Sequence, residues 1–171
     1  ASIPHFAKAI KNEVEIEHFR KVMEKDGVAM VRFFKWLEAN IGKIEISELS
    51  AAEPLEALRS EQPHFVGNSF DAISGYKGHG AIIHYKVTPK TDWKMDADGV
   101  YLIDSGGQYL DGTTDITRTV TLGNPTEKEK IAYTSVLKAH IAIAMAHFPR
   151  GSTGRHLHAI CKQHLWNQGL D

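Results

Sequence analysis

The chain has 171 residues, of which 42% are hydrophobic, and this length and composition suit one compact domain with its own core. Its 20 Lys and Arg residues nearly balance its 21 Asp and Glu residues, so the formal charge of -1 provides no field to recruit nucleic acid or an anionic membrane. No stretch is long and apolar enough for a signal peptide or a membrane span, and the single Cys161 cannot close an intrachain disulfide. We therefore expect a cytoplasmic protein that binds neither nucleic acid nor membrane and whose partners are small neutral or zwitterionic molecules.

The first part of the chain is predicted to be helical. Over residues 12–40 the apolar side chains recur at helical spacing, and Gly42 follows as a stop signal. This pattern predicts one long helix, with Gly27 as the place where it would bend. A second helix is predicted over 47–59, provided that Pro54 lies in its first turns and does not break it.

After Pro63 the pattern changes to short β-rich runs separated by Gly, Asp and Asn, which is typical of antiparallel sheet. The expected strands are Phe70–Ser74, Ala81–Tyr85, Val100–Asp104 and Ile116–Leu122. Two further helices are predicted, one over 127–147 and one over 153–169. This order of elements predicts an α+β fold in which helices pack on one face of an antiparallel sheet.

The segment 100–119 contains the residues that indicate chemistry. If its two strands fold back about Tyr109 and Leu110, Asp104 lies opposite Asp115 and both side chains point to one face. Opposite residues on paired strands lie about 5 Å apart at Cβ, and two like charges there are destabilising. Asp104 also ends an apolar strand, where an unpaired charge is costly. A divalent cation would remove both problems, and a pair of cations bridged by Asp115 would do so better.

A purely structural interpretation of the same residues stays open on the pattern alone. Asp104 could start a turn and accept hydrogen bonds from the backbone that follows it, while Asp115 could pair with Arg118. A bare pair of aspartates favours this interpretation. Asp111 precedes a glycine and has the composition of an ordinary turn, so it is left out of the predicted site.

A longer resemblance decides between the two interpretations. The runs Asp104-Ser-Gly-Gly-Gln-Tyr and Asp111-Gly-Thr-Thr-Asp115-Ile-Thr-Arg-Thr resemble the metal-binding hairpin of Xaa-Pro aminopeptidase (aminopeptidase P), in the wider pita-bread family of prolidase, methionine aminopeptidase and creatinase. The similarity continues in Lys8-Ala-Ile-Lys-Asn12, Gly80-Ala-Ile-Ile-His84-Tyr85 and Leu165-Trp-Asn-Gln-Gly-Leu-Asp171, so it covers essentially the whole chain. It implies that residues 1–171 are the N-terminal half of the catalytic domain and the first half of a pita-bread fold, with the upstream domains and the C-terminal half outside this sequence.

The resemblance also implies a metal centre. Enzymes of this kind hold two metal ions with two aspartates, one histidine and two glutamates, and the matching aspartates here are Asp104 and Asp115. The histidine is expected in a His-Gly-x-Gly-His-Gly motif directly after Asp171, and both glutamates further on. Three of the five ligands are therefore expected outside this sequence. Oxygen-rich ligation suits Mn²⁺, Co²⁺ or Zn²⁺, and the resemblance favours Mn²⁺.

His84 follows an apolar run on a predicted strand, a pattern that by itself favours a core histidine. In the family, a histidine at the matching place lines the substrate pocket and helps to stabilise the tetrahedral intermediate, so the resemblance implies a catalytic role for His84. His79 is predicted to be a loop residue. The histidines of the two late helices form no ligand cluster by spacing and are predicted to lie on the surface: His140, His147, His156, His158 and His164.

The implied activity is metal-dependent hydrolysis of an N-terminal Xaa-Pro peptide bond by the intact protein, with a proline-containing peptide as substrate. Two alternatives stay open: a pita-bread relative that has lost its metals and binds peptides or proteins, and a prolidase-like dipeptidase. The presence of Asp104, Asp115 and His84 argues against the binding module. The residues of the motifs over 80–85 and 111–115 are more similar to the aminopeptidases and argue against the dipeptidase. Half a domain exposes the face that its other half would cover, so we also expect a homodimer or another association through that face.

Overall fold

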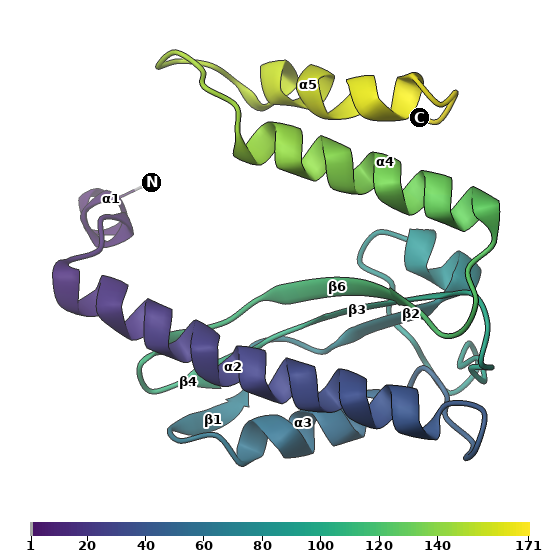
Figure 1. Cartoon of the computed structure of the whole chain (residues 1–171). Helices are drawn as coiled ribbons and strands as arrows, with labels where there is room; N and C mark the ends of the chain where they lie inside the picture. Colours follow the sequence, from purple (N-terminus) through teal and green to yellow (C-terminus); the bar gives the residue numbers. More distant parts are fainter. Residues whose placement is uncertain (1) are drawn as a thin grey trace. The chain divides into compact units, whose positions relative to one another are not determined.

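The computed structural model describes residues 2–171 (Figure 1). The chain forms two compact units, one that ends at Gly123 and one that comprises Asn124–Asp171. The helices are α1 (Ile3–Ala9), α2 (Glu13–Asn40), α3 (Ala52–Ser60), the short 3-10 helix η1 (Lys77–Ala81), α4 (Glu127–Ala144) and α5 (Gly154–Trp166). The strands are β1 (Phe65–Asn68), β2 (Ile73–Tyr76), β3 (Val100–Ser105), β4 (Gly107–Tyr109), β5 (Gly112–Thr113) and β6 (Ile116–Thr121). In this described part of the chain, no helix combines the length and the apolar character needed to cross a membrane.

The long helix α2 begins at a capping box. The Asn12 side chain accepts a hydrogen bond from the Glu15 N–H at 2.9 Å, and the Glu15 carboxylate accepts one from the Asn12 N–H at 3.0 Å. The helix then continues without interruption through Gly27 to Asn40. The predicted long helix is therefore confirmed.

The second helix, α3, begins at Ala52, later than the sequence predicted. The residues before it form a turn in which the Ala51 N–H donates to the Ser47 carbonyl at 2.9 Å. Pro54 lies in the first turn of α3, where a missing N–H breaks no helical hydrogen bond. The predicted position of Pro54 within its helix is confirmed.

The strands form two three-stranded antiparallel sheets, ordered β2–β3–β6 and β1–β4–β5. The expected strands around Val100 and Ile116 correspond to β3 and β6, and β2 overlaps the end of the expected Phe70–Ser74 strand. The second sheet was not predicted, because its strands of 4, 3 and 2 residues are too short to show an alternating pattern. The chain passes from one sheet to the other three times, between β1 and β2, between β3 and β4, and between β5 and β6.

The hydrophobic core lies between the sheet β2–β3–β6 and the helices α2 and α3, which cover one face of it in Figure 1. Along β3, Tyr101, Ile103 and Ser105 are buried, whereas the residues between them are half-buried. Because successive strand residues point to opposite faces, Leu102 and Asp104 lie on the face away from these two helices. The predicted α+β arrangement, with helices packed on one face of an antiparallel sheet, is confirmed.

The predicted strand Ala81–Tyr85 is wrong. Residues Lys77–Ala81 form η1, and a turn follows in which His84 adopts a positive φ of 55°. Gly80 packs closely on β2 and β3, since a Cβ there would lie 3.2 Å from the Gly75 carbonyl oxygen and 3.4 Å from the Leu102 Cβ. A short apolar run does not by itself distinguish a strand from other buried structure, and here contacts distant in sequence decide its conformation.

In the unit Asn124–Asp171, α4 and α5 pack against each other. Thr126 and Thr153 cap these helices through capping boxes. Both helices end a few residues before the expected boundaries.

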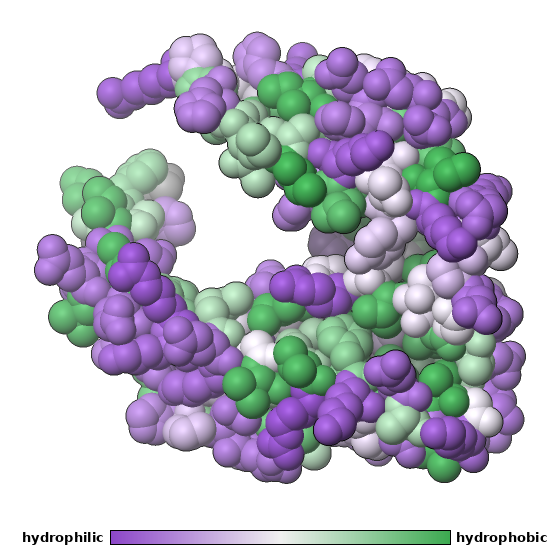
Figure 2. Space-filling model, in the orientation of Figure 1, coloured by the Kyte–Doolittle hydropathy of each residue, from purple (hydrophilic) through white to green (hydrophobic). Residues whose placement is uncertain are grey.

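Figure 2 shows hydrophobic side chains gathered on α1 and along α4. These exposed residues include Ile3, Phe6, Val136, Leu137, Ile141 and Met145.

Candidate metal centre

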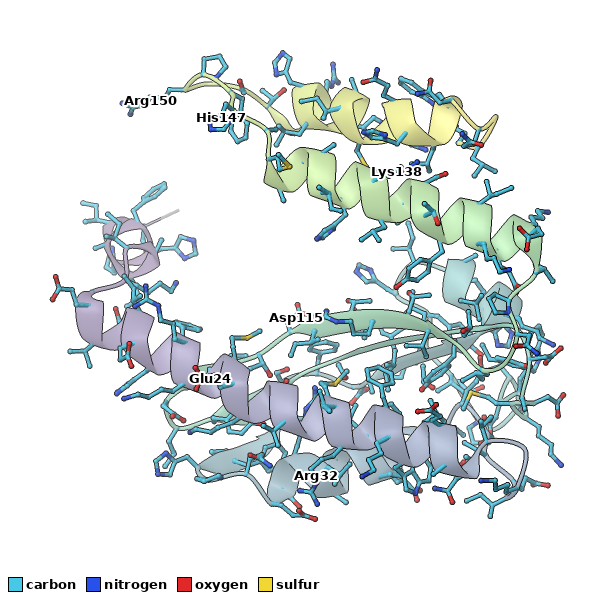
Figure 3. All side chains as sticks on the ribbon, in the orientation of Figure 1. Glu24, Arg32, Asp115, Lys138, His147 and Arg150 are labelled. Carbon is cyan, nitrogen blue, oxygen red and sulfur yellow. The ribbon has the colours of Figure 1, made fainter. Side chains whose placement is uncertain are left out.

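The two predicted metal-ligating aspartates lie at facing ends of neighbouring strands. Asp104 is the penultimate residue of β3, and Asp115 directly precedes β6, where Figure 3 labels it. The pairing predicted between them is wrong, because Asp104 lies opposite Thr117. Tyr109 pairs with Gly112, so the hairpin turns one residue later than expected and every cross-strand partner shifts by two.

A shift of two residues leaves the faces of the strands unchanged. Because side chains alternate along a strand, Asp115 and Thr117 point to the same face, and this is the face of Asp104. Ile116, between them, points into the core. The two aspartates are therefore diagonal neighbours on the face of the sheet away from α2 and α3.

The electrostatics of the pair differ from those of ordinary surface carboxylates. Desolvation raises the pKa of the Asp115 carboxyl, and the negative charge of Asp104 raises it further. The Asp104 Oδ1 atom is buried and has no hydrogen-bond partner among the described residues. Within residues 2–171, the buried Asp104 Oδ1 therefore has neither a hydrogen-bond donor nor a cation to compensate its charge.

The structural interpretation of these residues finds no support in the contacts. Arg118 donates from Nη1 to the Thr117 carbonyl at 2.7 Å, and within residues 2–171 it forms no ion pair with Asp115. Arg118 also points to the opposite face of β6, since it pairs with the buried Ile103. No backbone N–H that follows Asp104 donates to its carboxylate in the described residues.

Two facing carboxylates with an orphaned oxygen suit a hard or borderline divalent cation, which takes oxygen ligands and supplies the missing positive charge. Asp104 and Asp115 would hold such an ion. Within residues 2–171, no group of three or more His, Cys, Asp or Glu side chains could hold a metal. The candidate donor set among the described residues is the pair Asp104 and Asp115.

His84, the predicted catalytic histidine, is exposed and forms no hydrogen bond with any described residue. It lies at the end of the segment that begins with η1. The contact of Gly80 with Leu102 places η1 on the face of β3 that also carries Asp104, because Leu102 and Asp104 point the same way. The segment that carries His84 thus starts on the same side of the sheet as the two aspartates.

His79 has a larger structural role than the sequence predicted. Its Nδ1 lies 3.0 Å from both carboxylate oxygens of the fully buried Glu48, and its ring stacks on Trp93 at 3.7 Å and on Tyr85 at 4.4 Å. Glu48 also accepts the N–H groups of Tyr76 at 2.7 Å and Trp93 at 3.1 Å. This network anchors η1 and the start of the His84 segment. A buried glutamate 31 residues before a histidine leaves no local sequence signal.

Asp111 is not a simple turn residue either. Its Oδ2 lies 2.5 Å from the Lys25 Nζ on α2, and the Lys25 ammonium group holds the pKa of the Asp111 carboxyl below its ordinary value. The contact attaches the tip of the β4–β5 hairpin to α2. Most of the late histidines are exposed as predicted: His140, His147, His156 and His158. His164 is half-buried.

Comparison with known proteins identifies the family of the chain. The model of metallopeptidase family M24 matches residues 17–171. The chain belongs to this family. It is 52% identical over 167 residues to a protein named probable Xaa-Pro aminopeptidase P from Arthroderma gypseum, in an alignment that covers 96% of this chain and 26% of that relative. A second such relative, from Sclerotinia sclerotiorum, is also 52% identical, with 28% of its length covered.

Solved M24-like structures share the fold. The X-prolyl aminopeptidase of Caenorhabditis elegans, described as a cytosolic enzyme with a di-nuclear active site, is 40% identical, with a TM-score of 0.90 over 100% of this chain and 28% of that one. The prolidase of Thermococcus sibiricus is 26% identical, with a TM-score of 0.75 over 94% of this chain and 41% of that one. The predicted pita-bread class of fold is confirmed. The assignment of residues 1–171 to the N-terminal half of a catalytic domain stays a prediction.

Proposed function

We propose that this M24 chain supplies two carboxylate ligands, Asp104 and Asp115, to a dinuclear aminopeptidase that hydrolyses N-terminal Xaa-Pro bonds. The observation that carries the proposal is the pair of carboxyl groups on one face of the sheet, of which the buried Asp104 Oδ1 has no hydrogen-bond partner among the described residues. The relatives named Xaa-Pro aminopeptidase P support the substrate class. Because the chain spans 26% and 28% of those relatives, the activity is proposed for the whole protein.

The proposed metals are two Mn²⁺ ions, which when bound would acidify a water molecule and polarise the scissile carbonyl. Asp104 and Asp115 would orient these ions from one face of the sheet. His84, exposed and without a partner among the described residues, would donate a hydrogen bond to the peptide and to the negative charge that develops on its carbonyl oxygen.

Proline in the second position of the substrate fits this chemistry. Its tertiary amide has no N–H and its ring fixes the backbone, so a site for it needs shape and apolar surface more than a hydrogen-bond acceptor. Ile82 and Ile83, which precede His84, are 52% and 85% exposed and would offer such a surface. We propose that they contact the substrate beside His84.

The two rival functions receive less support. The chain is 26% identical to the Thermococcus sibiricus prolidase but 52% identical to the relative named probable Xaa-Pro aminopeptidase P. The higher identity favours the aminopeptidase over a prolidase-like dipeptidase. A metal-free binding module would have no need for two carboxyl groups held against each other at a cost in electrostatic energy. We also propose a cytosolic location, in line with the description of the Caenorhabditis elegans enzyme.

The test is metal-dependent release of the first residue from an Xaa-Pro peptide by the full-length protein, with an Xaa-Ala peptide as the control substrate. The Asp115→Asn variant should lose bound Mn²⁺ and activity together, by more than the roughly 10–100-fold that loss of an outer-shell partner costs. Asp71→Asn, at a side chain 86% exposed, is the matched control and should keep both. Unchanged metal content in Asp115→Asn would contradict the ligand assignment.

A further inference from the structure

Thr114, the residue directly before Asp115, is fully engaged by its surroundings. It is 1% exposed, and its N–H donates to the Gly107 carbonyl at 2.9 Å. Its own carbonyl accepts from the Ser69 Oγ at 2.9 Å, and its hydroxyl accepts from the Gly107 N–H at 2.8 Å. The same hydroxyl donates to the Asp26 Oδ2 at 2.8 Å. Every polar group of this residue therefore has a partner, which fixes the backbone at the point where Asp115 begins.

Asp26 on α2 is the hub of these contacts. Its carboxylate is completely buried and accepts from Arg59 on α3 twice, through Nε at 2.6 Å and Nη2 at 3.1 Å. The Tyr109 hydroxyl on β4 donates to it at 3.0 Å, and burial together with this carboxylate raises the pKa of Tyr109. A buried carboxylate with a bidentate arginine and two hydroxyl donors has a single favourable arrangement. It joins α2 and α3 to both arms of the hairpin.

Gly106 links this hub to the other carboxylate. It lies two residues after Asp104, and a Cβ at this position would overlap the Thr114 carbonyl oxygen and the Ser69 Oγ. The two strands that carry the aspartates therefore touch directly at Gly106 and Thr114. Any displacement of Thr114 would change the separation of Asp104 and Asp115.

We propose that Asp26 is a positioning residue for the metal centre, and that it acts through the Thr114 hydroxyl to set the separation of the Asp104 and Asp115 carboxylates. The inference rests on the proposed function, because it assumes that these carboxylates bind metal. Outer partners that orient metal ligands typically contribute a factor of about 10–100 to metal affinity. The network around Asp26 would orient the ligand Asp115 in this way, because it fixes the backbone of the preceding residue, Thr114.

Calorimetric titration of the metal-free, full-length protein with Mn²⁺ tests the proposal. Thr114→Val removes the hydroxyl at constant shape and should weaken Mn²⁺ binding by about 10–100-fold. Thr114→Ser keeps the hydroxyl and should stay within about twofold of the wild type. Thr113→Val is the matched control, since that neighbouring hydroxyl donates to the exposed Gln108 side chain at 2.7 Å, and it should change nothing. Equal Mn²⁺ affinity in Thr114→Val and the wild type overturns the proposal.

A second measurement needs no variant and applies even where Thr114→Val fails to fold. Hydrogen exchange of the wild-type segment 105–115 should show protection before Mn²⁺ is added, because Asp26 and not the metal orders the hairpin. Protection that appears only with Mn²⁺ overturns the inference. If the wild type and Thr114→Val bind Mn²⁺ and cleave Xaa-Pro peptides equally well, the inference about Asp26 is overturned but the proposed function is not. A wild type that binds no Mn²⁺ overturns the proposed function as well.

Discussion

The Arg59→Met substitution would leave the Asp26 carboxylate buried without its cation. The two side chains are 2% and 0% exposed, and the guanidinium contacts both carboxylate oxygens. Removing one partner of a buried ion pair costs about 3–5 kcal/mol, because the remaining charge stays out of water. Tyr109 and Thr114 still donate to this carboxylate, so we expect the lower part of that range, about 3–4 kcal/mol. The ratio of folded to unfolded protein should then fall by more than about 100-fold.

The matched control is Arg32→Met. The Arg32 Nη1 lies 2.5 Å from the Glu61 Oε2, but these side chains are 46% and 54% exposed, so the loss should be below about 1 kcal/mol. Urea unfolding followed by tryptophan fluorescence measures both free energies. Among the three tryptophans of residues 1–171, a Trp166→Phe background leaves the two of the unit that ends at Gly123. Equal losses in the two variants would refute the reasoning.

Two further predictions concern other anchoring contacts. Lys25 lowers the pKa of Asp111 in the folded state. The ionised Asp111 carboxylate therefore stabilises the folded protein at pH values above its ordinary pKa near 4. This stabilisation is lost as the pH falls through the lower pKa of the folded state. Lys25→Met should therefore destabilise the protein at pH 7 and much less at about pH 2–3, and an equal shift of the urea midpoint at both pH values would argue against the ion pair. His79→Ala should cost about 1–3 kcal/mol, because Glu48 loses a donor in a buried site, and should shift the Trp93 emission to the red. A red shift that persists when His79→Ala is made in a Trp93→Phe background would assign the signal to another tryptophan.

The helices could be predicted from local signals. Asn12 and Thr126 each precede a periodic apolar run and cap the helix that follows, and Pro54 marks the first turn of α3. The strand predicted at Ala81–Tyr85 failed because its conformation is decided by contacts from elsewhere. Glu48 and the packing of Gly80 on β3 hold that segment in η1 and a turn.

The candidate site likewise combines features that local sequence signals predict with contacts between distant residues that they do not predict. Asp104 and Asp115 could be predicted as a pair from their strands and motif, and a register error of two residues left them on the correct face. The network that holds them could not be predicted. Arg59, Tyr109 and Thr114 follow Asp26 by 33, 83 and 88 residues, and no pattern in one sequence joins positions so far apart.

The neighbouring residues Lys25 and Asp26 hold the hairpin at two different places. Lys25 binds its tip through Asp111, and Asp26 binds its base through Thr114. A hairpin attached at one point could pivot, whereas two attachments to one helical turn remove that rotation. Small movements of α2 would therefore carry the hairpin and Asp115 along as a rigid body. A ligand that displaced this helix would shift the proposed metal centre without reshaping the loop that carries Asp115.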